Sequence, residues 1–185
     1  MVTLDRPMAA EERACAASLA ALDRALEEVA AVISVLSPEA YRARPLPDIS
    51  GSIGEHVRHC LDHVNALVSA DRSSDLSYDR RDRGTAVETD PAAALRSIQL
   101  LRIKIAVGRW SAWAHEPIFV ASTISRDGDV VTGMSTIARE MTFVLNHTIH
   151  HQATIGLLAS LQGCGVPDGF GFAHSTPRLA ARRGF

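Results

Sequence analysis

Apolar residues recur at alternating steps of three and four along much of this 185-residue chain, which is the spacing of one face of an α-helix. The clearest case runs from about Ala10 to Leu36, where one stripe contains Leu19, Leu22, Leu26, Val29, Ile33 and Leu36. Pro38, Pro45 and Pro47 then interrupt the helical pattern. Hydrophobic residues make up 46% of the chain and aromatic residues 5%, a balance that favours helices packed on helices over a sheet sandwich.

Two further helices are predicted from their first turns. Ser52 and Glu55 have the spacing of a capping box, in which each side chain bonds the other residue's backbone N–H. Asp90 followed by Pro91 combines a capping side chain with a proline in the first turn. The helical period after Pro91 continues to Trp113, so the third helix is predicted to extend that far.

A fourth helix is predicted from about Ser135 to Leu161, with Gly163 placed to end it. Between the third and fourth helices, two β-prone runs at 118–124 and 130–132 flank an Asp-Gly turn at Gly128. That arrangement predicts a small β-hairpin.

These elements predict an all-α fold, a single four-helix bundle domain spanning residues 1–185, with the hairpin between its third and fourth helices. The polar stretch from Asp71 to Thr89 has no convincing period, and loops of this length tend to be functional or disordered. The tail from about 164 to 185 is rich in glycine and proline, so we expect an irregular segment that packs across the bundle.

Composition narrows the classes of partner and compartment. The formal net charge is −2 and the basic residues are scattered, which argues against a nucleic-acid partner. No apolar run approaches the ~20 residues that cross a membrane. The first residues include acids where a secretion signal needs an apolar core, and the three cysteines form no C-x-x-C pair. These features predict a cytoplasmic protein.

The fourth helix contains polar residues on its predicted core face. A seam at steps of three and four contains Ile137, Glu140, Val144, His147, His151, Thr154 and Leu158. Residues four apart differ by about 40° and roughly 6 Å of rise, so His147 and His151 can bind one metal ion. His150 is rotated about 100° from His151 and is expected on another face.

A second histidine stripe lies in the second helix, where His56, His59 and His63 follow at steps of three and four. His59 is the best placed to turn inward, His63 could replace it or support it, and His56 is expected at the site mouth or in solvent. Three histidines would leave an open position on the ion, at which water or a thiolate is activated. Imidazoles bind several divalent metals, of which zinc and nickel are the leading candidates.

Two stretches resemble the DinB-like superfamily: SIGEHVRHCLDH, from Ser52 to His63, and REMTFVLNHTIHHQATI, from Arg139 to Ile155. The resemblance implies an up-down-down-up bundle that holds a metal with one histidine of the second helix and two of the fourth. Placed on this sequence, those ligands are His59, His147 and His151. It also implies thiol-dependent S-transfer with a low-molecular-weight thiol, or hydrolysis, and pairing into a homodimer.

The leading hypothesis is therefore a metal-dependent enzyme that acts on a small-molecule substrate by thiol transfer or hydrolysis. The H-E-x-x-H motif is absent because Thr148 follows His147, so Glu140 and His63 are the candidate catalytic groups. Arginines in the 71–89 loop would suit a carboxylate-bearing substrate or thiol. Two alternatives are a non-catalytic metal- or small-molecule-binding bundle, and a structural dimer whose histidines form a buried hydrogen-bonded network.

Overall fold

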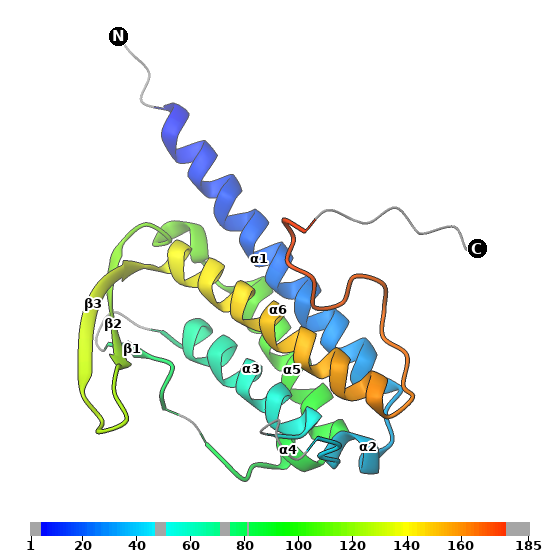
Figure 1. The fold of residues 1–185 in the computed structure, drawn as a ribbon. Helices are drawn as coiled ribbons and strands as arrows, with labels where there is room; N and C mark the ends of the chain where they lie inside the picture. Colours follow the sequence, from blue (N-terminus) through cyan, green and yellow to red (C-terminus); the bar gives the residue numbers. More distant parts are fainter. Residues whose placement is uncertain (1–4, 47–50, 71–74, 81, 177–185) are drawn as a thin grey trace.

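The structure is a computed structural model that describes residues 5–46, 51–70, 75–80 and 82–176. Over those residues the fold is mostly helical, with one small three-stranded sheet (Figure 1). The helices are α1 (Asp5–Ser34), α2 (Pro38–Arg42), α3 (Ile53–Val68), α4 (Ala86–Thr89), α5 (Pro91–Val107), the 3₁₀ turn η1 (Trp110–Ala112) and α6 (Ile137–Leu161). The strands are β1 (Leu76–Ser77), β2 (Pro117–Thr123) and β3 (Val130–Thr136).

The long helices α1, α3, α5 and α6 pack together as a bundle. α1 packs against α5 and α6, and α3 packs against the same two helices. Their inward faces form a continuous apolar core that includes Leu22, Leu26, Val57, Val64, Ile98, Val144 and Leu158. The leucine stripe of the first predicted helix therefore faces the core, although the helix begins at Asp5, earlier than expected.

Local hydrogen bonds set the first turn of α3 and of α5 at the predicted residues. The Ser52 hydroxyl accepts from the Glu55 backbone N–H, and the Glu55 carboxylate accepts from the Ser52 backbone N–H. The Asp90 carboxylate accepts from the Ala92 backbone N–H, and Pro91 occupies the first turn of α5. Both predicted helix starts are confirmed.

The prediction that the third helix continues to Trp113 is wrong. α5 ends at Val107 because Gly108 adopts extended backbone angles. The indole N–H of Trp110 then donates to the Ile105 carbonyl at 2.8 Å, which satisfies one of the carbonyls left open at the helix end. Trp110 is buried, so its ring packs into the core at the point where another helical turn would otherwise follow.

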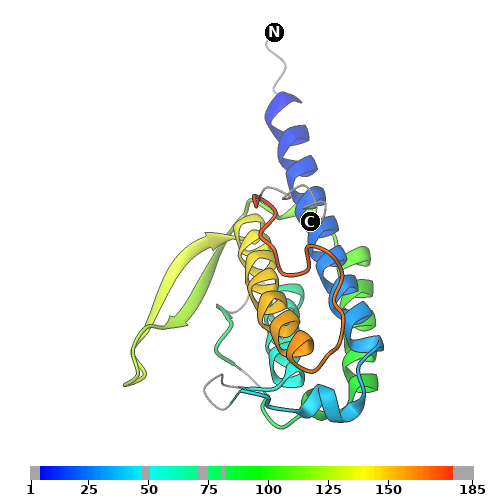
Figure 2. The same ribbon diagram turned by 45° about the vertical axis from the view of Figure 1, so that its right-hand side comes forward.

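The predicted hairpin is present as the antiparallel pair β2–β3. Figure 2 shows that it projects away from the helices. The polar 71–89 stretch contributes two short elements that its composition did not predict: β1, which pairs in parallel with β2, and the helix α4. Arg81 and residues 71–74 of that stretch lie outside the described residues.

α6 begins at Ile137 rather than Ser135, because Ser135 still pairs with Ile118 in the sheet. It ends before Gly163, which has a positive φ of 73°. The segment after Gly163 is largely irregular, as predicted, and returns along α6 with Phe170 buried (Figure 2). Residues 177–185 of the predicted tail lie outside the described part. Within the described residues, no helix has the length and apolarity to span a membrane.

Candidate metal centre

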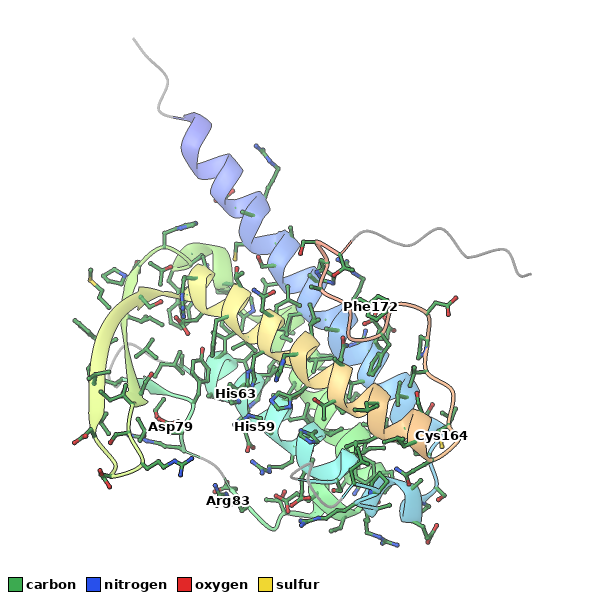
Figure 3. The ribbon with its side chains drawn as sticks, viewed as in Figure 1. His59, His63, Asp79, Arg83, Cys164 and Phe172 are labelled. Atoms are coloured by element: carbon green, nitrogen blue, oxygen red, sulfur yellow. The ribbon has the colours of Figure 1, made fainter. Side chains whose placement is uncertain are left out.

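Two helices that pack side by side, α3 and α6, bring the two histidine stripes together. His59 and His63 lie on α3 (Figure 3), and His147 and His151 lie on α6. The capping box at Ser52 fixes where α3 begins, and the buried apolar residues of α3 fix which side of the helix faces the core. The histidines that share one side of α3 are thereby directed towards α6.

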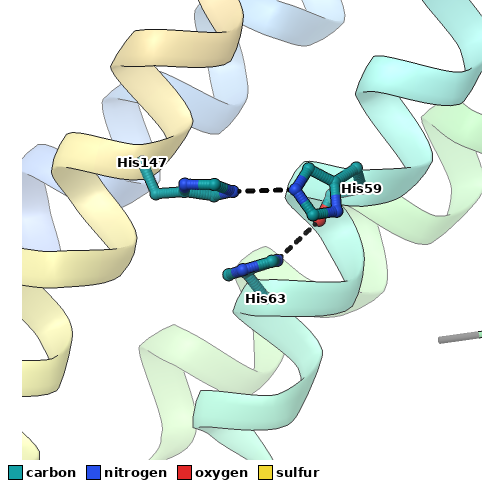
Figure 4. A group of neighbouring side chains, drawn as sticks. All are labelled: His59, His63 and His147. Carbon is teal, nitrogen blue, oxygen red and sulfur yellow. Dashed lines mark hydrogen bonds between the residues drawn. The ribbon is translucent and has the colours of Figure 1, made fainter. Parts of the chain in front are cut away.

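The tightest group consists of His59, His63 and His147, whose ligand nitrogens all lie within 4.8 Å of one another (Figure 4). The Nε2 atoms of His59 and His147 are 3.0 Å apart. In a tetrahedral zinc site, bonds of about 2.0–2.1 Å place two ligand nitrogens roughly 3.3–3.4 Å apart. The spacing of this pair is therefore close to that of two ligands of one ion, and the group could hold a divalent metal.

The orientation of His63 follows from its contact with the helix backbone. Its Nδ1 lies 3.0 Å from the carbonyl oxygen of His59, one turn earlier. A carbonyl can only accept, so Nδ1 carries the proton and Nε2 carries the lone pair of the neutral ring. His63 is 4% exposed, and its ring stacks on that of His147 with centroids 4.0 Å apart. A backbone carbonyl that fixes the tautomer in this way is a common partner of metal-binding histidines.

His151, the third ligand that the DinB-like resemblance implies, lies beside this group. Its ring centroid is 4.6 Å from those of His59 and His147. Its Nδ1 is 3.1 Å from Nδ1 of His56, the residue expected at the mouth. Burial, with a smaller effect of charge on His147 and His56, lowers the pKa of His151 to about 3. His151 is thus neutral at ordinary pH, and His150 is exposed on another face.

Glu140, a candidate base, lies in the core and its two oxygens accept three hydrogen bonds. Oε2 accepts from the Tyr78 hydroxyl at 3.0 Å, and Oε1 accepts from Ser135 at 2.6 Å and from Arg139 at 2.7 Å. The Tyr78 ring in turn stacks on His63, with centroids 5.0 Å apart and an interplanar angle of 3°. Glu140 therefore contacts the histidine group through Tyr78, an arrangement that suits a supporting role.

Tyr78 is the residue of this site that sequence reasoning missed. It lies in the 71–89 stretch, from which only arginines were predicted to serve the site, yet it is 8% exposed. The signal that could have found it is Leu76 and Tyr78, two large apolar residues in alternation within a polar stretch. That alternation corresponds to strand β1, which carries the loop back against α6.

A pocket with a volume of about 490 Å³ adjoins the histidine group. Its lining residues are Arg44, Gly51, Glu55, His56, Arg58, His59, Arg83, Glu88 and His151. Arg58 makes ion pairs with Glu88 at 2.9 Å and with Asp62 at 2.7 Å. Arg83, an arginine of the polar 71–89 stretch, also lines this pocket and is labelled with His59 in Figure 3. It is the arginine of that stretch to which the prediction of a substrate-binding arginine applies.

Comparison with known proteins leaves the family of this chain open. No family model matches the chain, and no solved structure matches it. A curated protein from Rhizopus delemar, named FK506-binding protein 5, is 33% identical over 103 residues, which are 55% of this chain and 26% of that protein. The chain therefore spans about a quarter of the relative that it matches, and this partial overlap does not show a family.

Proposed function

We propose that this chain is a metal-dependent enzyme that acts on a small molecule by thiol transfer or hydrolysis. The observation that carries the proposal is the convergence of His59, His63 and His147, from two helices, to within 4.8 Å. Three neutral imidazoles are a ligand set typical of catalytic zinc, which keeps one position for water or substrate. A divalent ion at this position, zinc or nickel, would supply Lewis-acid activation of a water or a thiolate.

His59 and His147 belong to both candidate ligand sets. The geometry favours His63 as the third ligand, because its Nε2 lone pair belongs to the compact group. The resemblance to DinB-like proteins favours His151, which contacts the same two rings. The up-down-down-up topology of those proteins is part of the same proposal, and is supported by the packing of α1 and α3 on the shared neighbours α5 and α6.

The residues around the group have distinct roles in this proposal. His59 and His147 bind the ion, while Tyr78 and the His59 carbonyl orient His63. The 490 Å³ pocket, which His56 and His151 line together with His59, admits the substrate. It has the size of a small-molecule site.

A metal-binding protein without turnover is the second candidate, and one observation favours it. The carboxylates closest to the site are engaged: Glu140 accepts three hydrogen bonds, and Glu55 and Glu88 are paired with arginines. A general base must have an oxygen or nitrogen within hydrogen-bond reach of the reacting atom. In the enzyme, that role would fall to whichever of His63 and His151 is not a ligand.

Elemental analysis tests the metal site on protein purified without a metal-affinity tag. The wild type should contain close to one divalent ion per chain, and His59→Ala and His147→Ala should lose it. His63→Ala and His151→Ala identify the third ligand, because only its loss should abolish metal retention. His150→Ala is the matched control, since it removes an exposed imidazole from the same helix.

Absence of metal from the wild type, even after incubation with zinc or nickel, would exclude the metal-centre proposal. If metal is present, screens for thiol consumption and ester hydrolysis separate the two functions. An enzyme should show turnover that disappears in His147→Ala, whereas a binding protein should show none with either chain.

A further inference from the structure

The pocket beside the histidine group is strongly polar, and its charges are unevenly compensated. Its lining includes Arg44, Arg58 and Arg83. Arg58 is held between Glu88 and Asp62, and Arg44 pairs with Glu55 at 2.6 Å. Among the residues that the structure describes, Arg83 makes no ion pair, and its side chain is exposed at the pocket wall. One guanidinium is therefore available to a ligand in the pocket.

The histidines of the same lining add to this positive character when an ion is bound. They are His56, His59 and His151. Neutral imidazoles do not cancel the charge of a divalent ion, so a loaded site would present net positive charge to the pocket. A ligand that spans from the histidines to Arg83 would be favoured if it carried negative charge at its Arg83 end.

The neighbouring glutamates narrow the kind of anion. Glu55 and Glu88 neutralise the other two arginines of the lining, so a single guanidinium charge remains to balance a ligand group at this end of the pocket. A carboxylate has a single charge, and its two oxygens match the planar fork of an arginine. The volume of about 490 Å³ accommodates a small organic acid.

We propose that this pocket binds a small organic carboxylate, whose carboxylate group pairs with Arg83 while the rest of the molecule extends to the histidine group. The proposal rests on the proposed function, since it names the substrate class of the same site. It makes Arg83 the residue that selects an acid over its neutral analogue. The contrast between charged and neutral ligands can be measured without knowing the natural substrate.

Ligand-observed NMR titration with succinate, and with neutral succinamide for comparison, tests the proposal. The full-length chain is titrated in zinc-loaded and chelator-treated forms. Succinate should bind saturably and succinamide far more weakly, and Arg83→Gln should raise the dissociation constant for succinate roughly 10-fold or more. Arg80→Gln is the control, because it removes an exposed arginine of the same loop that lines a different pocket. The dissociation constant of the Arg80→Gln variant for succinate should stay within about twofold of the wild-type value.

The outcomes separate this inference from the metal proposal. Equal weakening by Arg83→Gln and Arg80→Gln, equal binding of succinate and succinamide, or no saturable binding would overturn the carboxylate site, even if zinc binds. A specific effect of Arg83→Gln in chelator-treated protein would support it even if zinc fails to bind, in which case only the metal proposal falls.

Discussion

The hydroxyl of Tyr78 should contribute strongly to stability, because it donates to a carboxylate in the core. Tyr78 is 8% exposed and Glu140 0%, and their oxygens are 3.0 Å apart. Burial, reinforced by the negative charge of Glu140, raises the pKa of Tyr78, so the phenol keeps its proton and continues to donate. A hydrogen bond to a charged group contributes about 1.5–3 kcal/mol.

Tyr78→Phe removes this donor and keeps the ring that stacks on His63. Glu140 retains Ser135 and Arg139 as donors, but Arg139 is largely exposed and contributes little. The free energy of unfolding should therefore fall by about 1.5–3 kcal/mol. For a domain of this size, each kcal/mol lowers the melting temperature by roughly 2–4 °C.

Urea unfolding, monitored by circular dichroism, measures the free energy of unfolding of Tyr78→Phe, Glu140→Gln and the double variant. The two substitutions should be non-additive by about 1 kcal/mol or more, because they remove the two ends of one interaction. Tyr41→Phe is the control, since the buried Tyr41 hydroxyl donates to the neutral Val87 carbonyl at 2.8 Å. Additivity of Tyr78→Phe with Glu140→Gln to within roughly 0.5 kcal/mol would refute the reasoning.

Two further predictions concern helix packing. Gly54→Ala should lower the free energy of unfolding by about 1–3 kcal/mol, because the added Cβ would collide with the Glu88 carbonyl and the Tyr41 ring. Thermal or urea melts measure this change. A gain in stability of ~1 kcal/mol, which helix propensity alone predicts, would contradict the reasoning. The hydrogen bond from Arg102 lowers the pKa of Asp23, so the stabilisation exists above the unfolded-state pKa and is lost as pH falls through the folded-state pKa. Arg102→Gln should therefore cost about 0.5–1 kcal/mol in urea unfolding at pH 7 and less near about pH 3, whereas an equal cost at both pH values would argue against the ion pair.

The sequence by itself determined the features that depend on residues close together in the chain. The helix starts at Ser52 and Asp90 were predictable because each cap bonds a backbone N–H two or three residues ahead. The hairpin was predictable because an Asp-Gly turn joins its two strands. The same regular spacing showed that His147 and His151 share a side of their helix, and that His59 can face inward.

Only the tertiary structure decided which histidines meet across the two helices. The contact of His59 with His147, and the inclusion of His63 in the compact group, depend on the axial offset and rotation of α3 against α6. Packing of the whole core sets that offset, and helical spacing carries no information about it. In the same way, Tyr78 reaches His63 and Glu140 because β1 pairs with a strand more than forty residues later in the chain.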